Sequence, residues 1–219
     1  MRTFTTLLIV SFLCLTVHVS AQSAADSTKV DGMETLIPTG NYTSGGFGGP
    51  VIKVGPVDGS TGVFFGARGG WVINRTFVLG GGGYGYTDMN NFSGSATMDT
   101  NIAFGYGGLE LEYLINANSV VHATVLAHIG AGGFTVYQHS GGGMYGDMDG
   151  NSMYSTACFV FEPAVNAEVN ILSWLRLTVG AGYRFVTGID YTNPSGSRRY
   201  DNSTVSGLFG VGMLKFGPY

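Results

Sequence analysis

Residues 175–185, LRLTVGAGYRF, alternate strictly between two kinds of side chain. Leu175 and Phe185 belong to an apolar set, whereas Arg176 and Arg184 belong to a set that is otherwise threonine and glycine. A period of two residues is that of a β-strand, whose successive side chains point to opposite faces of a sheet. In a soluble sheet the charged face meets water, but in a membrane barrel the apolar face meets lipid and the polar face lines the lumen. The alternation therefore predicts a strand and leaves its environment to other features of the chain.

The composition narrows the choice of fold. Among 219 residues there are 37 glycines, but only 10 Lys and Arg and 14 Asp and Glu. With 6 prolines and no Gly-X-Y repeat the chain is not a collagen, and a hydrophobic share of 44% excludes a disordered chain. Each interior glycine costs a helix about 1 kcal/mol relative to alanine. A formal net charge of -4 argues against nucleic acid as a partner, so the composition favours an all-β domain.

Eight segments share this alternation. They lie near residues 45–56, 61–73, 76–87, 98–115, 119–137, 156–171, 175–189 and 204–217. Most are longer than the about 5 or 6 residues typical of soluble sheets, and they match the roughly 9 to 11 residues that a tilted membrane strand needs.

The connections between these segments alternate in length. Tight turns are expected at 74–75, 116–118 and 172–174, and long polar loops at 88–97, 138–155 and 190–203. The connection at 57–60 departs from this pattern, because it is short on the side of the long loops. Short periplasmic turns and long outer loops are typical of outer-membrane barrels. The sequence therefore predicts an all-β fold, an eight-stranded antiparallel up-and-down transmembrane β-barrel.

The first residues predict export. Arg2 precedes an apolar run at 7–19, and Ala21 ends a group of small residues suited to cleavage. We expect a signal peptide at 1–21, a periplasmic lead-in at 22–43 and the barrel at 44–219. Cleavage removes Cys14 and leaves Cys158 as the single cysteine, so the exported chain can form no internal disulfide.

A glycine-rich pattern recurs every 50 residues, at 79–84, 129–134 and 179–184. Each copy lies on a strand that follows a tight turn. The register places six glycines on the lumen face, namely Gly80, Gly82, Gly130, Gly132, Gly180 and Gly182. Because they lack side chains, these residues leave room for a small and strongly coiled sheet to close.

The same register directs the charged strand residues into the lumen. We predict a lumen ionic network of Lys53, Arg68, Glu110, Glu112, Glu162, Glu168, Arg176 and Arg184, with His122, His128 and Lys215 on the same face. An eight-stranded barrel is just wide enough to be filled by its own side chains, and buried charges persist only when they are paired. We therefore expect a salt-bridged plug, with a narrow pore as the alternative.

Two motifs suggest chemistry but lack its context. Residues 80–85 match G-x-G-x-x-G, yet the helix that a phosphate cradle needs does not follow them. His139 and Ser140 begin an outer loop, but no acid stands at a spacing that would orient the histidine. We expect no catalytic, cofactor or metal site, and keep a lipid-modifying enzyme as an alternative.

The loop at 138–155 carries the candidate surface contacts. These are Met144, Tyr145, Asp147, Asp149 and Asn151. Residues 147–151 space oxygen ligands as calcium loops do, but Cys158 stands where such a loop has its last acid. Because methionine and tyrosine make adaptable contact surfaces, we expect this loop to meet a partner, with weak divalent-ion binding as the alternative.

These features resemble the small eight-stranded outer-membrane barrels, the class of outer-membrane protein X and the membrane domain of outer-membrane protein A. The likeness rests on the signal peptide, eight strands over 45–217, Trp71 and Trp174 beside tight turns, and a last strand at 205–216, VSGLFGVGMLKF. The opening GGFGGP at 45–50 is also similar to Bacteroidetes-type outer-membrane barrels. The resemblance implies a structural or surface-interaction protein of a Gram-negative outer membrane, with lipid, lipopolysaccharide and a surface or host protein as partners. A secreted soluble β protein is the remaining alternative.

Overall fold

The computed structural model describes residues 43–87, 100–138, 151–192, 196 and 199–218. The expected signal peptide, and all but the last residue of the expected lead-in, lie outside these ranges.

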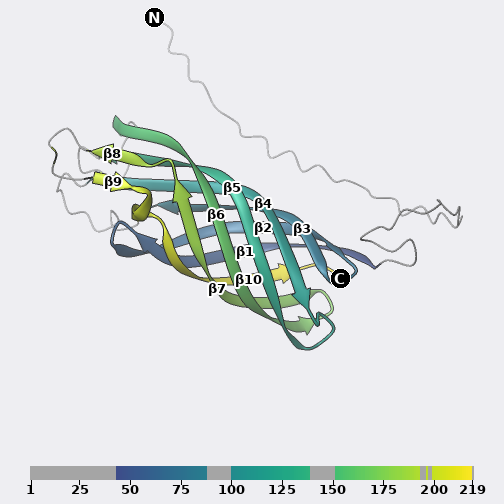
Figure 1. Ribbon diagram of the computed structural model, residues 1–219. Coiled ribbons are helices and arrows are strands. Elements are labelled where there is room, and N and C mark those ends of the chain that lie inside the picture. Colours follow the sequence, from purple (N-terminus) through teal and green to yellow (C-terminus); the bar gives the residue numbers. More distant parts are fainter. Residues whose placement is uncertain (1–42, 88–99, 139–150, 193–195, 197–198, 219) are drawn as a thin grey trace, which may run out of the picture. The chain divides into compact units, whose positions relative to one another are not determined.

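Eight long strands close into a barrel (Figure 1). They are β1 (Ser44–Val57), β2 (Ser60–Ile73), β3 (Phe77–Thr87), β4 (Thr100–Ile115), β5 (Val121–Gln138), β6 (Asn151–Leu172), β7 (Leu175–Thr187) and β10 (Gly207–Phe216). Their order is β1-β10-β7-β6-β5-β4-β3-β2, and each neighbouring pair is antiparallel. The last strand pairs with the first, for example Gly212 with Ile52, so the sheet has no open edge over this register. The predicted eight-stranded antiparallel barrel is confirmed.

Tight turns join the strands at one end, which we call the short-turn end. Asn74 and Arg75 both have positive φ, 53° and 52°, in the turn between β2 and β3. Consecutive positive φ values produce the sharp hairpin turns whose twist matches that of the strands. Asn116, with a φ of 58°, bends the chain after β4.

The opposite end, which we call the loop end, carries a small second hairpin and a helical turn. The hairpin consists of β8 (Asp190–Thr192) and β9 (Arg199–Asp201), and η2 (Asn202–Thr204) follows it directly. Asp201 caps η2, because its carboxylate accepts a hydrogen bond from the Ser203 N–H at 2.9 Å. The sequence treats 190–203 as a loop, and this local capping is the reason that part of it is ordered structure.

Two strand boundaries differ from the prediction by three residues or more. The sixth strand begins at Asn151 instead of residue 156, because β5 continues to Gln138 and its backbone offers partners as far as Asn151. The last strand begins at Gly207 instead of residue 204, because the chain first completes η2. Backbone pairing, which the polar residues at 151–155 do not reveal, sets the first of these limits.

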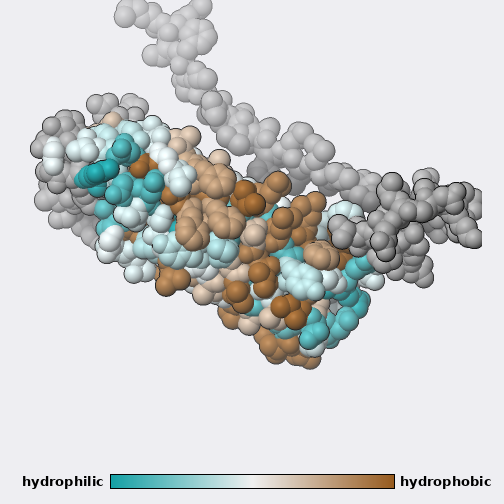
Figure 2. All heavy atoms as spheres, in the orientation of Figure 1, coloured by the Kyte–Doolittle hydropathy of each residue, from teal (hydrophilic) through white to brown (hydrophobic). Residues whose placement is uncertain are grey.

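The two faces of the strands have opposite character. On β7, Leu177 and Val179 are exposed, while Arg176 and Thr178, which alternate with them, are buried. On the side shown in Figure 2, hydrophobic residues gather over the strands and hydrophilic ones toward the ends. Large apolar side chains are exposed along the whole barrel wall, and Leu109, for example, is 66% exposed. Soluble proteins rarely expose so large an apolar surface to water. The arrangement is that of an outer-membrane β-barrel, whose strands cross the bilayer with the apolar face in lipid.

Exposed aromatic rings mark the short-turn end of the wall. Trp71, Tyr113 and Trp174 are each about half exposed, at 47%, 46% and 51%. Trp174 stacks on Phe216 and Tyr113 packs edge-on against Phe77, so the rings form pairs along the rim. Such rings are enriched where a membrane meets water. No helix among the described residues is long and apolar enough to cross a membrane.

Glycines on the lumen face let neighbouring strands approach each other closely. A Cβ on Gly130 would lie 2.2 Å from the carbonyl oxygen of Gly107, and one on Gly180 would lie 2.1 Å from Oδ1 of Asn166. Glycines on the lipid face have more space: a Cβ on Gly133 would meet no atom within 4 Å, and one on Gly81 would lie 3.2 Å from the nearest atom. The lumen glycines are therefore part of how the small barrel closes.

Candidate functional site: the lumen ionic network

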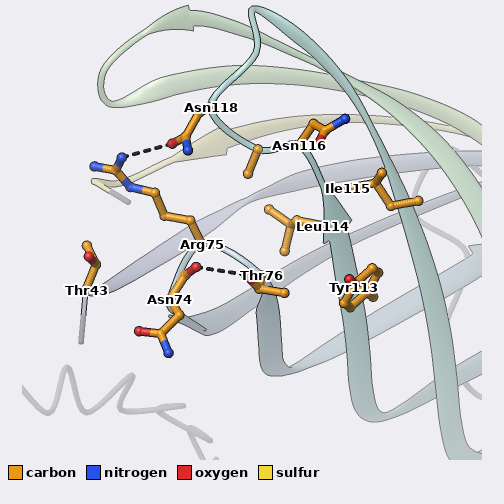
Figure 3. A pocket seen from close by; sticks show the side chains of 10 residues that line it. Thr43, Asn74, Arg75, Thr76, Tyr113, Leu114, Ile115, Asn116 and Asn118 are labelled. Carbon is orange, nitrogen blue, oxygen red and sulfur yellow. Dashed lines mark hydrogen bonds between the residues drawn. The ribbon is translucent and has the colours of Figure 1, made fainter. Parts of the chain in front are cut away.

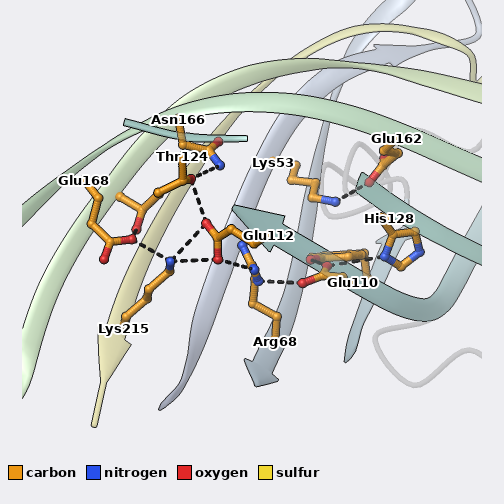
Figure 4. Close-up of polar contacts among 12 residues, drawn as sticks. Lys53, Arg68, Glu110, Glu112, Thr124, His128, Glu162, Asn166, Glu168 and Lys215 are labelled. Atoms are coloured by element: carbon orange, nitrogen blue, oxygen red, sulfur yellow. Dashed lines mark hydrogen bonds and ion pairs between the residues drawn. The ribbon is translucent and has the colours of Figure 1, made fainter. Parts of the chain in front are cut away.

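The barrel brings together nine charged side chains in its interior. They are Lys53, Arg68, Glu110, Glu112, Glu162, Glu168, Arg176, Arg184 and Lys215, and none is more than 7% exposed. They come from six of the eight strands and form two sets of ion pairs, which the Tyr84 ring joins; Figure 4 shows most of them. The lumen therefore holds five bases and four acids.

Glu112 and Glu168 form the part of the network nearer the short-turn end, and Lys215 joins them. Its Nζ lies 2.5 Å from Oε2 of Glu168 and 3.1 Å from Oε2 of Glu112. Arg68 Nη2 donates to the same Glu112 oxygen at 2.9 Å, and the Thr124 hydroxyl donates to its Oε1 at 2.7 Å. Glu112 is thus held by two bases and one hydroxyl.

Arg176 and Thr178 complete the surroundings of Glu168. The Thr178 hydroxyl donates to Oε2 of Glu168 at 3.0 Å, and Arg176 Nε lies 3.8 Å from its Oε1. Arg176 also donates from Nε to the Asn170 side-chain oxygen at 3.0 Å, and from Nη1 to the Gly217 carbonyl at 3.2 Å. This arginine ties the carboxylate to the end of the last strand.

Glu110 forms the link to the middle of the barrel through Arg68. Arg68 Nε and Glu110 Oε2 are 2.5 Å apart, while Nη2 of the same arginine reaches Glu112. The Tyr84 hydroxyl donates to Oε1 of Glu110 at 2.5 Å, and His128 Nδ1 lies 3.3 Å from that oxygen. One guanidinium therefore bridges two carboxylates that stand two residues apart on β4.

Glu162 is the centre of the remaining cluster. Lys53 forms an ion pair with its Oε2, and Arg184 Nε and the Tyr106 hydroxyl donate to its Oε1 at 2.9 and 2.6 Å. Lys53 Nζ also lies 3.3 Å from the centre of the Tyr84 ring, which joins this cluster to that of Glu110. A cation over an aromatic face is stabilised by the ring quadrupole.

Apolar side chains border the network on both sides. Toward the loop end, Phe64, Phe104 and Phe134 are at most 1% exposed, and the Arg184 guanidinium lies 3.9 Å from the centre of the Phe64 ring. Toward the short turns, Phe47 and Leu114 are buried below Arg68 and Glu112.

This geometry explains how the charges tolerate burial, and what they can do. Each of the four glutamates has at least three polar or charged partners within 4 Å. Charges out of water persist when they are paired and hydrogen-bonded in this way. A carboxylate with all its neighbours in place is poorly suited to accept a proton from a substrate or to bind a passing ion. The network is suited to fill the lumen.

The sequence did not reveal the hydroxyl partners of the carboxylates. Tyr84, Tyr106, Thr124 and Thr178 each donate to a glutamate. The only available signal was their position, because all four lie on the lumen face of their strands at the same alternation as the charges. Each histidine faces a glutamate: His128 Nδ1 lies 3.3 Å from Oε1 of Glu110, and His122 Nε2 lies 3.5 Å from Oε1 of Glu168.

Most residues singled out in the outer loop lie beyond the structural description. Met144, Tyr145, Asp147 and Asp149 are outside the described residues, as are His139 and Ser140. Asn151 begins β6, but its side chain is also outside the description. The glycine motif at 80–85 lies within β3, a strand, and the residues that follow this strand, 88–99, are outside the description. In the described residues no group of three His, Cys, Asp or Glu could hold a metal ion.

At the loop end, aromatic rings connect the hairpin to the barrel. The rings of Tyr154 and Tyr191 stack at 4.6 Å, and those of Tyr191 and Tyr200 lie nearly parallel at 6.3 Å. Arg199 Nη2 pairs with Asp190 Oδ1 at 3.2 Å across the exposed side of the hairpin.

The solvent-facing acid of η2 is held in its charged form. Hydrogen bonds from the Ser203 hydroxyl and the Ser203 N–H lower the pKa of Asp201 below its usual value. The cap of η2 is therefore in place at neutral pH.

Comparisons with known proteins find distant similarity to solved structures. No protein-family model matches the chain, and no curated protein matches its sequence. Among solved structures, Neisserial surface protein A gives a TM-score of 0.47 at 13% identity, over 81% of this chain and 97% of that one. Ail, the attachment invasion locus protein of Yersinia pestis, gives 0.43 at 15% over 80% and 95%, and the outer membrane protease OmpT from Escherichia coli gives 0.31 at 8% over 80% and 93%. No residue role is carried over from any of them.

Proposed function

We propose that this chain is a small outer-membrane barrel with a closed lumen, which acts through its loop end as a structural or surface-interaction protein. The observation that carries the proposal is the filled interior. Four glutamates and five bases form ion pairs with one another there, between layers of apolar side chains. A lumen arranged in this way offers no path of water for an ion. What remains available to partners is the end that carries the hairpin and the long connections.

The orientation follows from the lengths of the connections. Short turns in outer-membrane barrels face the periplasm and long loops face the exterior. The turns after β2, β4 and β6 would then be periplasmic, and β8, β9 and η2 would face the cell exterior, where lipopolysaccharide and surface or host proteins are the partners within reach. The Bacteroidetes-type likeness of GGFGGP at 45–50 stays a prediction that no comparison supports.

Conductance tests the closed lumen. Purified, refolded barrel inserted into a planar bilayer should show no stepwise current at any voltage that the bilayer tolerates. Heat-dependent mobility on a gel should show beforehand that the protein is folded. Reproducible unitary steps from folded protein would contradict the proposal and favour the narrow pore.

Loop exchange tests the role of the loop end. A chain in which residues 139–150 are replaced by a short Gly-Ser connection should retain the barrel but lose binding to lipopolysaccharide or to intact target cells. Equal binding by the two chains would remove this connection from the proposed function. The lipid-modifying alternative is tested by comparing lipid A from cells with and without the protein. If the chain has no lipid-modifying activity, the two samples of lipid A should be identical.

A further inference from the structure

A polar pocket lies at the short-turn end, away from the lumen network. It has a volume of about 490 Å³ and lies between the turn joining β2 to β3 and the turn that follows β4 (Figure 3). The pocket wall includes Asn74, Arg75, Asn116 and Asn118 from the two turns, together with Tyr113 from the wall of the barrel.

Arg75 occupies a strained position in this pocket. Its φ of 52° lies in the left-handed region, which residues other than glycine and asparagine rarely adopt. Hairpin turns of this kind strongly favour glycine there. Strained backbone of this kind persists where the surrounding structure maintains it, and it clusters at ligand-binding and other functional sites.

The guanidinium of Arg75 is available to a ligand. Its Nη1 donates to Asn118 Oδ1 at 3.0 Å, and it forms no ion pair with any described residue. A guanidinium has five N–H donors in a planar fork, so most of them remain unused. The other described bases at this end, Arg176 and Lys215, are buried and paired with Glu168. Arg75 is thus an exposed positive charge without a counter-ion in the described chain.

The pocket also borders the lipid. Tyr113 and Ile115 line it and are 46% and 41% exposed on the outer wall, where Tyr113 packs against Phe77. Tyrosine at such a rim lies at the level of the lipid headgroups. A group that contacts both the arginine and these two side chains is anionic at one end and apolar at the other.

We propose that this pocket binds the phosphate group of a phospholipid from the adjoining leaflet, which in the orientation proposed above is the periplasmic one. The free side of the Arg75 fork contacts the phosphate oxygens, a geometry that arginine suits particularly well. Asn74 and Asn116 also line the pocket, and Figure 3 shows their side-chain amides pointing away from the guanidinium. The acyl chains then follow the outer surface beside Tyr113 and Ile115. The inference concerns the end opposite to the proposed surface contacts and does not depend on them.

Native mass spectrometry of the intact, folded barrel tests the proposal, with phosphatidylglycerol titrated as the probe. The Arg75→Gly variant is the sharpest test, because glycine adopts this φ freely and folding should be as good or better. We expect lipid binding to weaken by about tenfold, the effect of losing a charge-assisted contact. The matched control, Arg199→Gln, removes an exposed arginine at the other end and should bind lipid as the unaltered chain does. Equal binding by Arg75→Gly and the unaltered chain would overturn the proposal.

Two further probes identify the source of the phosphate. Diacylglycerol, which has the acyl chains but no phosphate, should bind equally to the unaltered chain and to Arg75→Gly. Inorganic phosphate at millimolar concentration should leave the bound phosphatidylglycerol in place. Displacement of the lipid by inorganic phosphate, or binding of diacylglycerol that requires Arg75, would overturn the assignment to a lipid phosphate.

Discussion

Gly130 faces the lumen and Gly133 faces the lipid, only three residues further along β5. A Cβ on Gly130 would lie 2.2 Å from a carbonyl oxygen of the neighbouring strand, whereas one on Gly133 would meet nothing within 4 Å. The charged and apolar residues show the same contrast between the two faces. The charged lumen side chains form specific ion pairs, whereas the apolar side chains of the wall face lipid. The lumen face is therefore specified residue by residue, and the lipid face mainly by polarity.

The largest effect is expected from glycine itself. Gly130→Leu should prevent most of the protein from folding, because overpacking against backbone cannot be relieved by a side-chain movement and costs about 3 kcal/mol or more. Gly133→Leu should fold as the unaltered chain does. The fraction of folded protein in vesicles, read from heat-dependent gel mobility, measures both. Normal folding of Gly130→Leu would show that the lumen glycines are not needed for closure.

Removing a charge from the lumen comes next. Glu162→Gln leaves Lys53 and Arg184 buried without their carboxylate, and breaking a buried pair in this way costs about 3 to 5 kcal/mol. Urea-dependent unfolding in vesicles measures the change. On the same strand, Val165→Ala at the lipid face should change stability by less than about 1 kcal/mol, because Val165 is 62% exposed.

A double variant separates the charge from the packing of the lumen. Adding Lys53→Met to Glu162→Gln removes one of the orphaned bases, so part of the lost stability should return. Strictly additive losses would mean that the two residues do not act as a pair.

Adding a charge to the lipid face has a smaller effect that depends on depth. Val179→Lys places an ammonium on the middle of β7, where a charge facing lipid costs about 2 to 4 kcal/mol. Leu175→Lys, at the short-turn end of the same strand, should cost about 0 to 1 kcal/mol because the side chain reaches the headgroups. Equal costs at the two positions would argue that β7 does not cross a bilayer in this register.

The alternation of residues predicted the faces of the strands but not the partners within the lumen. Arg176 and Arg184 alternate with Leu175 and Phe185, and the structure buries the arginines and exposes Phe185. Lys53 and Glu162, by contrast, are 109 residues apart in sequence, and only closure of the sheet brings them together. Local patterns report which face a residue occupies, whereas ion pairs depend on the order and stagger of all eight strands.

Other features had no local signal either. The start of β6 at Asn151 depends on how far β5 extends beside it. The amino-acid composition of the two strands does not predict where their pairing begins. In the sequence Arg75 is an ordinary polar turn residue. Its positive φ, an unfavourable backbone conformation for arginine, is visible only in the structure.

The apolar layers on either side of the lumen charges have a consequence for the barrel's surroundings. Salt weakens electrostatic attraction when mobile ions can approach the charges, over a distance of about 10 Å at 0.1 M. Glu112 and Glu162 are at most 2% exposed between Phe104 and Phe134 on one side and Phe47 and Leu114 on the other, so mobile ions have little access to them. We therefore expect the salt concentration outside the cell to have little effect on the attraction between these groups.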